Sequence, residues 1–141
     1  MVRAAGLIVF RKGQEDGCIE YLLLQAPKSL HWTPPKGRLD SGEDDFTAAV
    51  RETREESGLT EADLRVLDGF QHILSYQAKG KDKTVIYWLA ELKNQLAKVR
   101  LSHEHCDFRW FNIEQVRQVT ETHPNQLKMM EEAEKFLRSS V

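Results

Sequence analysis

The chain has 141 residues, of which 40% are hydrophobic and 30% are charged. A chain of this length and balance can bury a sizeable core, which excludes a wholly disordered protein and predicts one domain over residues 1–141. The 20 Lys and Arg residues are nearly balanced by 22 Asp and Glu residues, and the net charge of −2 argues against a general binder of DNA or of membrane surfaces.

Apolar segments and cysteines bear on the cell compartment. The apolar runs Ala4–Phe10 and Val85–Ala90 are too short to cross a bilayer, and Arg11 ends the first run too early for a signal peptide. Cys18 and Cys106 lack the spacing of a metal site, and so few thiols are typical of a reducing compartment. We therefore expect a cytoplasmic protein with no membrane contact.

Hydrophobic periodicity and turn residues predict the order of the elements. The first half is predicted to contain a hairpin of strands Ala4–Arg11 and Glu20–Ala26 about the turn Gly13–Gly17, a segment over Pro27–Gly42 that is mostly loop, and a helix over Glu43–Ser57. The second half is predicted to contain strands Arg65–Gln77, Thr84–Leu92 and Asp107–Phe111, a short helix capped by Asn112 and ending at Val119, and a last helix from Pro124 to about Leu137. Because strands and helices do not alternate strictly, we expect an α+β domain with helices on both faces of a mixed sheet.

The helix predicted over Glu43–Ser57 breaks the usual rules for a stable helix. The residues expected to form its buried stripe, at i, i+3, i+4 and i+7 spacing, are Phe46, Ala49, Val50 and Thr53. Glu52, Glu55 and Glu56 share a different face, where like charges cost about 0.2–0.5 kcal/mol per pair. The last two glutamates also lie in the final turn, where the helix dipole disfavours anions.

This acidic face has two interpretations. The common one is a solvated helix surface with salt bridges. The other is a metal site, because clustered carboxylates are ligands of hard divalent cations such as Mg²⁺, which also bring phosphate-bearing substrates. The glycine-containing loop before the helix and the helix stop at Gly58 favour the metal site.

The same residues match a known motif. The chain fits the Nudix box, G-x5-E-x7-R-E-U-x-E-E-x-G-U, at Gly37, Glu43, Arg51, Glu52, Glu55, Glu56, Gly58 and Leu59. Thr53 stands where an aliphatic residue is usual, and its branched Cβ leads us to expect only a packing change. The chain thus resembles the Nudix hydrolases. This resemblance implies an α/β/α sandwich around a mixed central β-sheet, and Mg²⁺-dependent attack of water on a polyphosphate chain, with Mn²⁺ as a substitute ion.

Segments outside the box narrow the resemblance to the animal-type asymmetrical diadenosine tetraphosphate hydrolases. They are Leu22–Ala26, His31–Gly37, Tyr76 with Lys79–Lys83, Val85–Ala90 and Leu101–His105. The resemblance implies cleavage of a dinucleoside polyphosphate to ATP and AMP, and we expect the protein to be a monomer. Capped RNA 5′ ends share the polyphosphate bridge and form a second substrate class. The box is equally compatible with another Nudix pyrophosphohydrolase acting on capped RNA, ADP-ribose or a nucleoside triphosphate.

The resemblance also implies roles for individual residues. The metal ligands would be Gly37 through its carbonyl, Glu52, Glu55, Glu56 and Glu104. The catalytic set would be Arg51, Glu52, Glu56 and Glu104, with Glu104 as a candidate base and Arg51 paired with Glu43. The substrate-binding residues would be His31, Lys36, Tyr76, Lys81, Lys83 and Tyr87.

Several of these residues have a purely structural alternative. His31 could pack its own loop, Tyr76 could be an ordinary strand aromatic, and Lys79–Lys83 could be a solubilising turn. Tyr87 and Trp88 are neighbours on one strand, so at most one of them faces a ligand, and core packing is favoured for Trp88.

Two segments in the C-terminal half of the chain bear on a possible zinc site and on the binding of a second base. His103 and His105 flank Glu104, but no second pair of Cys or His residues is spaced to complete a zinc site. Where relatives carry an aromatic residue that completes a base clamp, this chain has Thr122 followed by His123. Either His123 takes the place of that aromatic residue, or the second adenosine is held loosely.

A non-catalytic nucleotide-binding module is an alternative of a different class. Such a module should lack some of the carboxylates, and none is missing.

Overall fold

The structure is a computed structural model that describes residues 2–13 and 17–139. The strands are β1 (Val2–Lys12), β2 (Ile19–Gln25), β3 (Trp32–Thr33), β4 (Lys36–Arg38), β5 (Leu64–Ala78), β6 (Lys81–Leu92) and β7 (Asp107–Phe111). The helices are α1 (Asp45–Ser57), α2 (Ile113–Val119) and α3 (Pro124–Ser139). Among the described residues, no helix is both long enough and apolar enough to cross a membrane.

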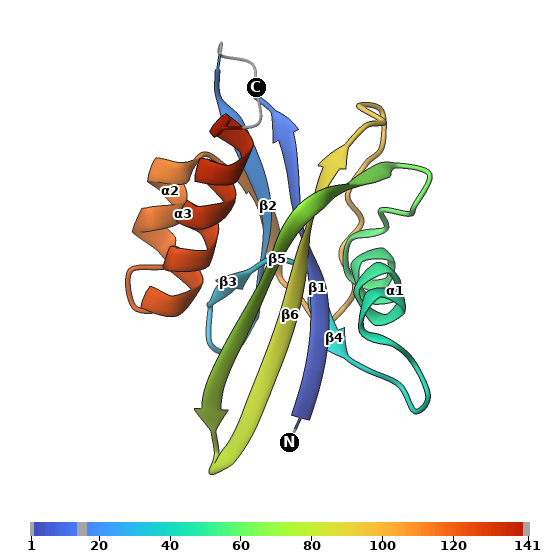
Figure 1. The fold of residues 1–141 in the computed structure, drawn as a ribbon, viewed down its shortest axis with the longest axis vertical. Coiled ribbons are helices and arrows are strands. Elements are labelled where there is room, and N and C mark those ends of the chain that lie inside the picture. Colours follow the sequence, from blue (N-terminus) through green and yellow to red (C-terminus); the bar gives the residue numbers. More distant parts are fainter. Residues whose placement is uncertain (1, 14–16, 140–141) are drawn as a thin grey trace.

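The strands form one mixed sheet in the order β3-β2-β1-β6-β5, with β4 added to β1 and β7 added to β2. The pairing of β1 with β6 is parallel, and the other pairings are antiparallel. Helix α1 covers one face of the sheet, and α2 with α3 covers the other (Figure 1). The predicted mixed α+β sandwich is therefore confirmed.

Strand β1 lies at the centre of this arrangement, and its sequence shows why. Residues 5 to 10 are apolar or glycine and lie buried between helices on both faces, so the run does not alternate with polar residues. Ala5, Leu7 and Val9 pack in the cluster beneath α1. Ile8 and Phe10 pack in the cluster beneath α3.

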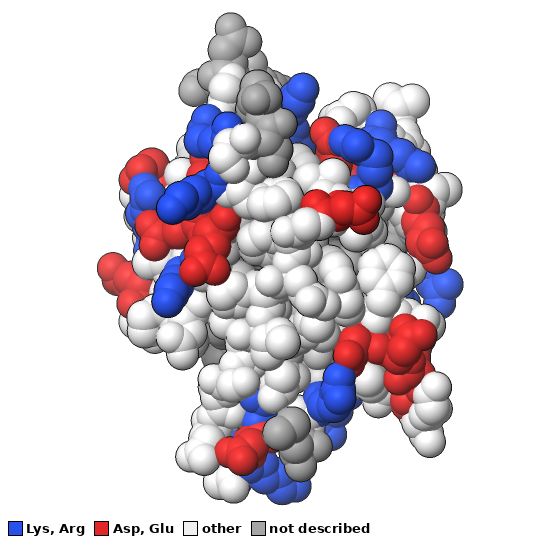
Figure 2. Space-filling view, in the orientation of Figure 1, with Lys and Arg blue, Asp and Glu red and all other residues white. Residues whose placement is uncertain are grey.

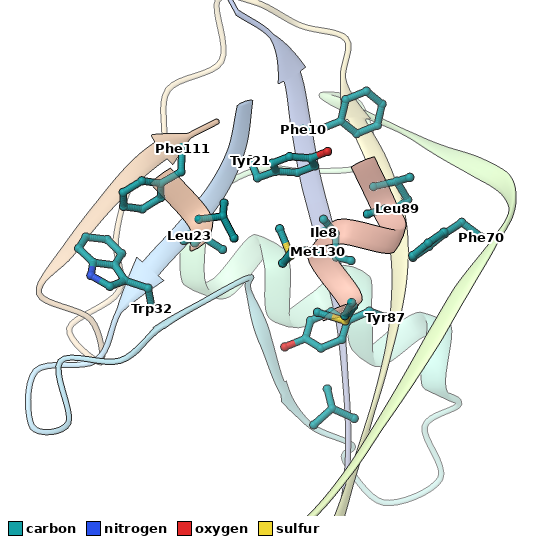
Figure 3. Packing of buried hydrophobic residues seen from close by; sticks show 14 residues of the cluster. Ile8, Phe10, Tyr21, Leu23, Trp32, Phe70, Tyr87, Leu89, Phe111 and Met130 are labelled. Atoms are coloured by element: carbon teal, nitrogen blue, oxygen red, sulfur yellow. The ribbon is translucent and has the colours of Figure 1, made fainter. Parts of the chain in front are cut away.

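The hydrophobic cluster beneath α3 includes residues that border the candidate site. Met129, Met130 and Ala133 of α3 are fully buried in it, which confirms that the last helix covers the core. Figure 3 shows Trp32 and Phe111 together at one side of this cluster, with their rings in an edge-to-face contact at 5.1 Å, and Tyr87 at another. In the face that Figure 2 shows, the middle is mostly uncharged, and Lys, Arg, Asp and Glu side chains gather toward its margins.

The segment Pro27–Gly42 is mostly loop, as predicted, and it also contains the short strands β3 and β4. Strand β4 pairs with Ala4–Gly6 in the first half of β1, with Gly37 opposite Ala5, and such short strands leave no periodic signal in the sequence. The predicted hairpin of β1 and β2 is confirmed, and residues 14–16 of its predicted turn lie outside the described residues.

The buried stripe predicted for α1 is wrong at Phe46, which is 39% exposed, and Val50 is only half-buried. The residues of α1 that are buried are Ala48, Ala49, Thr53, Glu56 and Ser57. Small side chains let α1 lie close to the sheet, whereas Phe46 packs at the margin, edge-on to Trp88 at 5.2 Å. This rotation of the helix turns Glu56 inward.

Candidate active site

Both ends of α1 are held by caps. The Asp44 side chain accepts a hydrogen bond from the Thr47 backbone N–H at 2.7 Å, which satisfies one of the free donors of the first turn. At the other end Gly58 adopts the left-handed conformation, with a φ of 78°, and donates to the Arg54 carbonyl. The caps fix both ends of α1, and the last turns of this helix carry Glu52, Glu55 and Glu56.

The Glu56 carboxylate is buried between α1 and β4. One of its oxygens accepts the backbone N–H of Lys36 at 3.0 Å, and the side chain belongs to a residue that is only 7% exposed. Burial raises the pKa of Glu56 to about 7, and the charges of Glu52 and Glu104 act in the same direction. The site therefore holds a carboxylate whose negative charge is poorly compensated by the protein.

Glu52 lies one turn earlier, directly against the backbone of β4. A Cβ added to Gly37 would stand 2.1 Å from the carboxyl carbon of Glu52, so glycine leaves the space that this carboxylate occupies. Burial raises the pKa of Glu52, and Arg51 opposes the shift. This close approach explains why the box has glycine at position 37, since any side chain there would displace the Glu52 carboxylate.

Arg51 organises the acidic cluster. Its guanidinium donates to both oxygens of Glu43 at 2.8 and 2.9 Å and to the Arg38 carbonyl at 2.9 Å. A third nitrogen donates to Glu52 at 2.9 Å and to Glu55 at 3.1 Å. The hydrogen bonds from Arg51 lower the pKa of Glu43 to about 2. The expected pairing of Arg51 with Glu43 is thus present, and the same cation also holds two of the predicted metal ligands.

The donor set suits a hard divalent cation, although the side chains are not gathered around one point. In the part of the chain that the structure describes, no three His, Cys, Asp or Glu residues form a group that could hold a metal ion as they lie. The fit rests on chemistry instead. Carboxylate oxygens are the ligands that Mg²⁺ prefers, and the raised pKa values of Glu52 and Glu56 reflect negative charge that a cation would stabilise.

Glu104 lies in a turn between β6 and β7. Its backbone N–H donates to the Ser102 hydroxyl at 3.3 Å, and the residue is exposed. The charge of Glu104 contributes to the raised pKa of both Glu52 and Glu56. The turn therefore faces the acidic end of α1, and Glu104 is within electrostatic reach of the cluster.

A cavity of about 400 Å³ opens beside this cluster, on the α3 side of the sheet. Among the residues that line it are His31, Lys36, Tyr76, Tyr87, Thr122 and His123. The first four are predicted substrate-binding residues, and the last two are the residues at the predicted base clamp. Lys36 connects the two parts of the site, because it is one of the residues that line the cavity and its backbone N–H also binds Glu56.

His31 and His123 stack inside the cavity. Their ring centroids are 3.5 Å apart and their planes differ by 13°. The Nε2 atom of His31 is buried without a hydrogen-bond partner, and burial together with the charges of His123 and Lys36 lowers the pKa of His31 to about 4. The structure thus places a second flat ring next to His31 where the sequence left the choice open.

The remaining predicted binding residues lie on the β5–β6 hairpin. Tyr87 is 1% exposed and faces the cavity, while Trp88 packs on the opposite face of the sheet, as strand alternation predicts. Tyr76 is 41% exposed and stands opposite Lys83 in the strand register. Lys81 and Lys83 do not line the cavity. They continue its face toward the tip of the hairpin.

One residue that supports the site carries no signal in the sequence. Gln126 is buried in the first turns of α3, and its side-chain amide donates to the Trp32 carbonyl at 2.7 Å. This bond ties α3 to β3 immediately after His31 and so holds the two stacking histidines together. A glutamine at a helix start has many possible roles, and only the fold selects this one.

Comparison with known proteins agrees with the fold and the motif. A family model described as the NUDIX domain matches residues 1–133. The mouse protein named bis(5′-nucleosyl)-tetraphosphatase [asymmetrical] is 47% identical over 125 residues, which covers 85% of each chain. A Caenorhabditis elegans protein of the same name is 50% identical over 115 residues, or 81% of each chain. A crystal structure of a C. elegans Ap4A hydrolase binary complex superposes with a TM-score of 0.92 and 42% identity, covering 99% of both chains.

Proposed function

The chain belongs to the NUDIX domain family, and we propose that it is an asymmetrical bis(5′-nucleosyl)-tetraphosphatase that hydrolyses diadenosine tetraphosphate to ATP and AMP. Relatives named for this activity match it at 47% and 50% identity over most of their length. The family alone leaves the substrate open, so the geometry of the site has to support the choice.

The observation that carries the proposal is the position of Lys36. Lys36 lines the cavity that contains the stacked imidazoles, and its backbone N–H binds Glu56. A ligand whose base stacks in this cavity would extend its phosphates past Lys36 toward the acidic end of α1. Flat partners suit a purine base, and a lysine ammonium suits a polyphosphate.

We further propose Mg²⁺ as the resident cation, with Mn²⁺ as a substitute. When bound, the cation would supply an activated water and would neutralise phosphate charge. Glu52, Glu55 and Glu56 would hold it, with the Gly37 carbonyl as a further oxygen ligand. Arg51 would keep its bonds to Glu43 and Arg38 and so maintain the orientation of the last turns of α1.

Glu104 is our candidate for removing the proton from the attacking water. It is the predicted carboxylate that lies off α1, and its charge already acts on Glu52 and Glu56. A separate carboxylate is needed because those that hold a cation are poor proton acceptors. Lys83 and Lys81 extend the cationic path for the longer phosphate chain toward the hairpin tip.

The products of a single reaction test this proposal. The protein is incubated with diadenosine tetraphosphate and Mg²⁺, and the nucleotides are separated. We expect equal amounts of ATP and AMP, and no product when Mg²⁺ is replaced by a chelator. Formation of two ADP molecules, or no turnover of this substrate beside rapid turnover of ADP-ribose or a nucleoside triphosphate, would contradict it.

Two broader expectations belong to the same proposal. Capped RNA 5′ ends contain a polyphosphate bridge between two nucleosides, so we propose that they are slower substrates of the same site. We also propose that the protein acts as a monomer, since the described chain by itself provides the residues assigned above. Light scattering during size-exclusion chromatography and decapping of a labelled RNA test these two expectations separately.

A further inference from the structure

Gln25 lies where two loops of the site leave the sheet. It is the last residue of β2, and it stands opposite Trp32 of β3 on one edge and opposite Asp107 of β7 on the other. His31 directly precedes β3, and the turn that carries Glu104 precedes β7. Gln25 is therefore placed between the loop that presents His31 and the turn that presents Glu104.

The residue before His31 has a strained backbone. Leu30 has a φ of 59°, in the left-handed region that the Cβ of a leucine disfavours. The residue is 58% exposed, so side-chain packing does not explain this conformation. Hydrogen bonds hold it instead, because the Leu30 N–H donates to the Ala26 carbonyl at 2.9 Å and the Ala26 N–H donates to the His31 carbonyl at 3.0 Å. Strain of this kind persists only where the surrounding structure imposes it.

The Gln25 side chain completes this set of hydrogen bonds. Its Nε2 donates at 3.1 Å to the Leu30 carbonyl, which belongs to the peptide that joins Leu30 to His31. Its Oε1 accepts the Cys106 thiol at 3.5 Å, so the nitrogen faces Leu30. The Cys106 backbone N–H also donates to the Gln25 carbonyl at 3.0 Å, which fixes the backbone from which the amide extends. A single amide thus acts on the peptide that carries His31.

We propose that Gln25 is a positioning residue for the base-binding end of the site: by stabilising the left-handed conformation of Leu30, it sets the direction from which His31 enters the cavity and stacks on His123. The assignment of His31 to the substrate base rests on the proposed function. The stacked rings are 3.5 Å apart, and a change in the ψ angle of Leu30 would turn the His31 side chain and separate them. Loss of the Gln25 donor should therefore weaken base binding and leave the acidic end of α1 intact.

Two substitutions of Gln25 remove the donor in different ways. Gln25→Met removes the amide at similar length, and Gln25→Glu keeps an acceptor for the Cys106 thiol but presents an oxygen to the Leu30 carbonyl. In a chelator buffer we expect both variants to bind adenosine about 3- to 10-fold more weakly than the wild type, the usual range for one hydrogen bond. The KM for diadenosine tetraphosphate should rise by a similar factor, while kcat should change by less than about 2-fold. Gln95→Met is the matched control and should bind adenosine as the wild type does, because Gln95 makes the same kind of bond to the Leu92 carbonyl and does not line the cavity.

A rescue experiment separates positioning from a general loss of stability. Glycine adopts a φ near that of Leu30 without steric cost. If Gln25 acts by holding Leu30 in this conformation, Leu30→Gly in the Gln25→Met background should return the adenosine affinity to within about 2-fold of the wild type. A stability defect at the end of β2 would not respond to this change. A double variant as weak as Gln25→Met would therefore overturn the inference.

NMR spectra of the histidine imidazoles give a readout that needs neither ligand nor turnover. In Gln25→Met we expect the ring resonances of His31 and His123 to shift, because their stack is disturbed, and those of His72 on β5 to stay. Unchanged His31 resonances, or wild-type adenosine affinity in Gln25→Met, would overturn the inference. A wild type that binds no adenosine or does not hydrolyse diadenosine tetraphosphate would count against the proposed function, and the imidazole spectra would still decide whether Gln25 positions His31.

Discussion

Replacing Glu56 by Gln should inactivate the protein and at the same time stabilise its fold above pH 7. The wild-type carboxylate is buried against β4 and carries a pKa of about 7, which burial raises from an ordinary 4.5. The Gln side chain has nearly the same shape, and its carbonyl can still accept the Lys36 N–H. The substitution therefore removes a buried charge while it retains the hydrogen bond.

The direction of the pH dependence follows from the order of the two pKa values. The unfolded chain releases the Glu56 proton near pH 4.5, and the folded protein releases it near pH 7. Between these values the folded state binds more protons, so wild-type stability falls as pH rises. The Gln variant has no proton to release. The gain in unfolding free energy of the Gln variant over the wild type should therefore be absent near pH 4 and complete above pH 7.

The stability gain of Glu56→Gln is limited by the size of the pKa shift of Glu56. A pKa raised from 4.5 to about 7 corresponds to at most about 3 kcal/mol, and relaxation around the charge reduces it, so we expect about 1–3 kcal/mol. For a domain of this size each kcal/mol moves the unfolding midpoint by about 3–4 °C. The variant should thus unfold about 3–12 °C above the wild type at about pH 8.5.

The assay is thermal unfolding in a chelator buffer between about pH 4.5 and 8.5, with turnover measured separately in Mg²⁺. Glu61→Gln, which changes an exposed glutamate just beyond α1, is the matched control and should show no pH-dependent gain. We expect turnover of Glu56→Gln to fall by about 100-fold or more. A stability difference that is the same at both ends of the pH range, or a variant less stable than the wild type at pH 8.5, would refute the burial argument.

Three other predictions follow from the same geometry. Gly37→Ala should change the unfolding midpoint little, because the group that the new methyl displaces is the flexible end of Glu52. The value of kcat/KM should nevertheless fall by about 10-fold or more, since Glu52 is moved from its position. Normal activity in this variant would contradict the close packing of Gly37 and Glu52. Glu43→Gln should destabilise the protein at neutral pH, and since the pKa of Glu43 is about 2, urea unfolding should show the difference shrinking as pH falls from 4.5 toward 2. Mg²⁺ should raise the unfolding midpoint of the wild type and leave Glu56→Gln unchanged; equal shifts in both proteins would remove Glu56 from the ligand set.

The spacing of the box residues predicts correctly which carboxylates of α1 share one side of the helix, but it predicts poorly which residues of α1 are buried. The i, i+3 and i+4 positions place Glu52, Glu55 and Glu56 on one side of a helix, and the structure shows them there. Periodicity also favours Phe46 in the core, because it weighs side-chain hydrophobicity and ignores how closely a helix can approach the sheet. Small residues such as Ala48 allow the closer approach, and the consequence is a buried Glu56 that no pattern indicates.

The cavity depends on contacts between distant parts of the chain. His31 and His123 stack although strands β3 to β7 lie between them in the sequence, and the bond from Gln126 that supports them has no motif. Strands β3 and β4 bring His31 and Lys36 into place, and at two and three residues they are too short to produce a periodic signal. Residue types alone therefore suggest the ligand-binding side chains, while their grouping requires the fold.

The parallel pairing of β1 with β6 has a consequence for how the molecule assembles. Residues Val2–Phe10 pair with Lys83–Glu91, so β1 is synthesised well before its parallel partner and can pair with it only after the intervening strands have been made. Contacts this distant are slow to form, and until then an apolar strand stays uncovered. During synthesis this N-terminal strand is where we would look first for chaperone engagement and for aggregation.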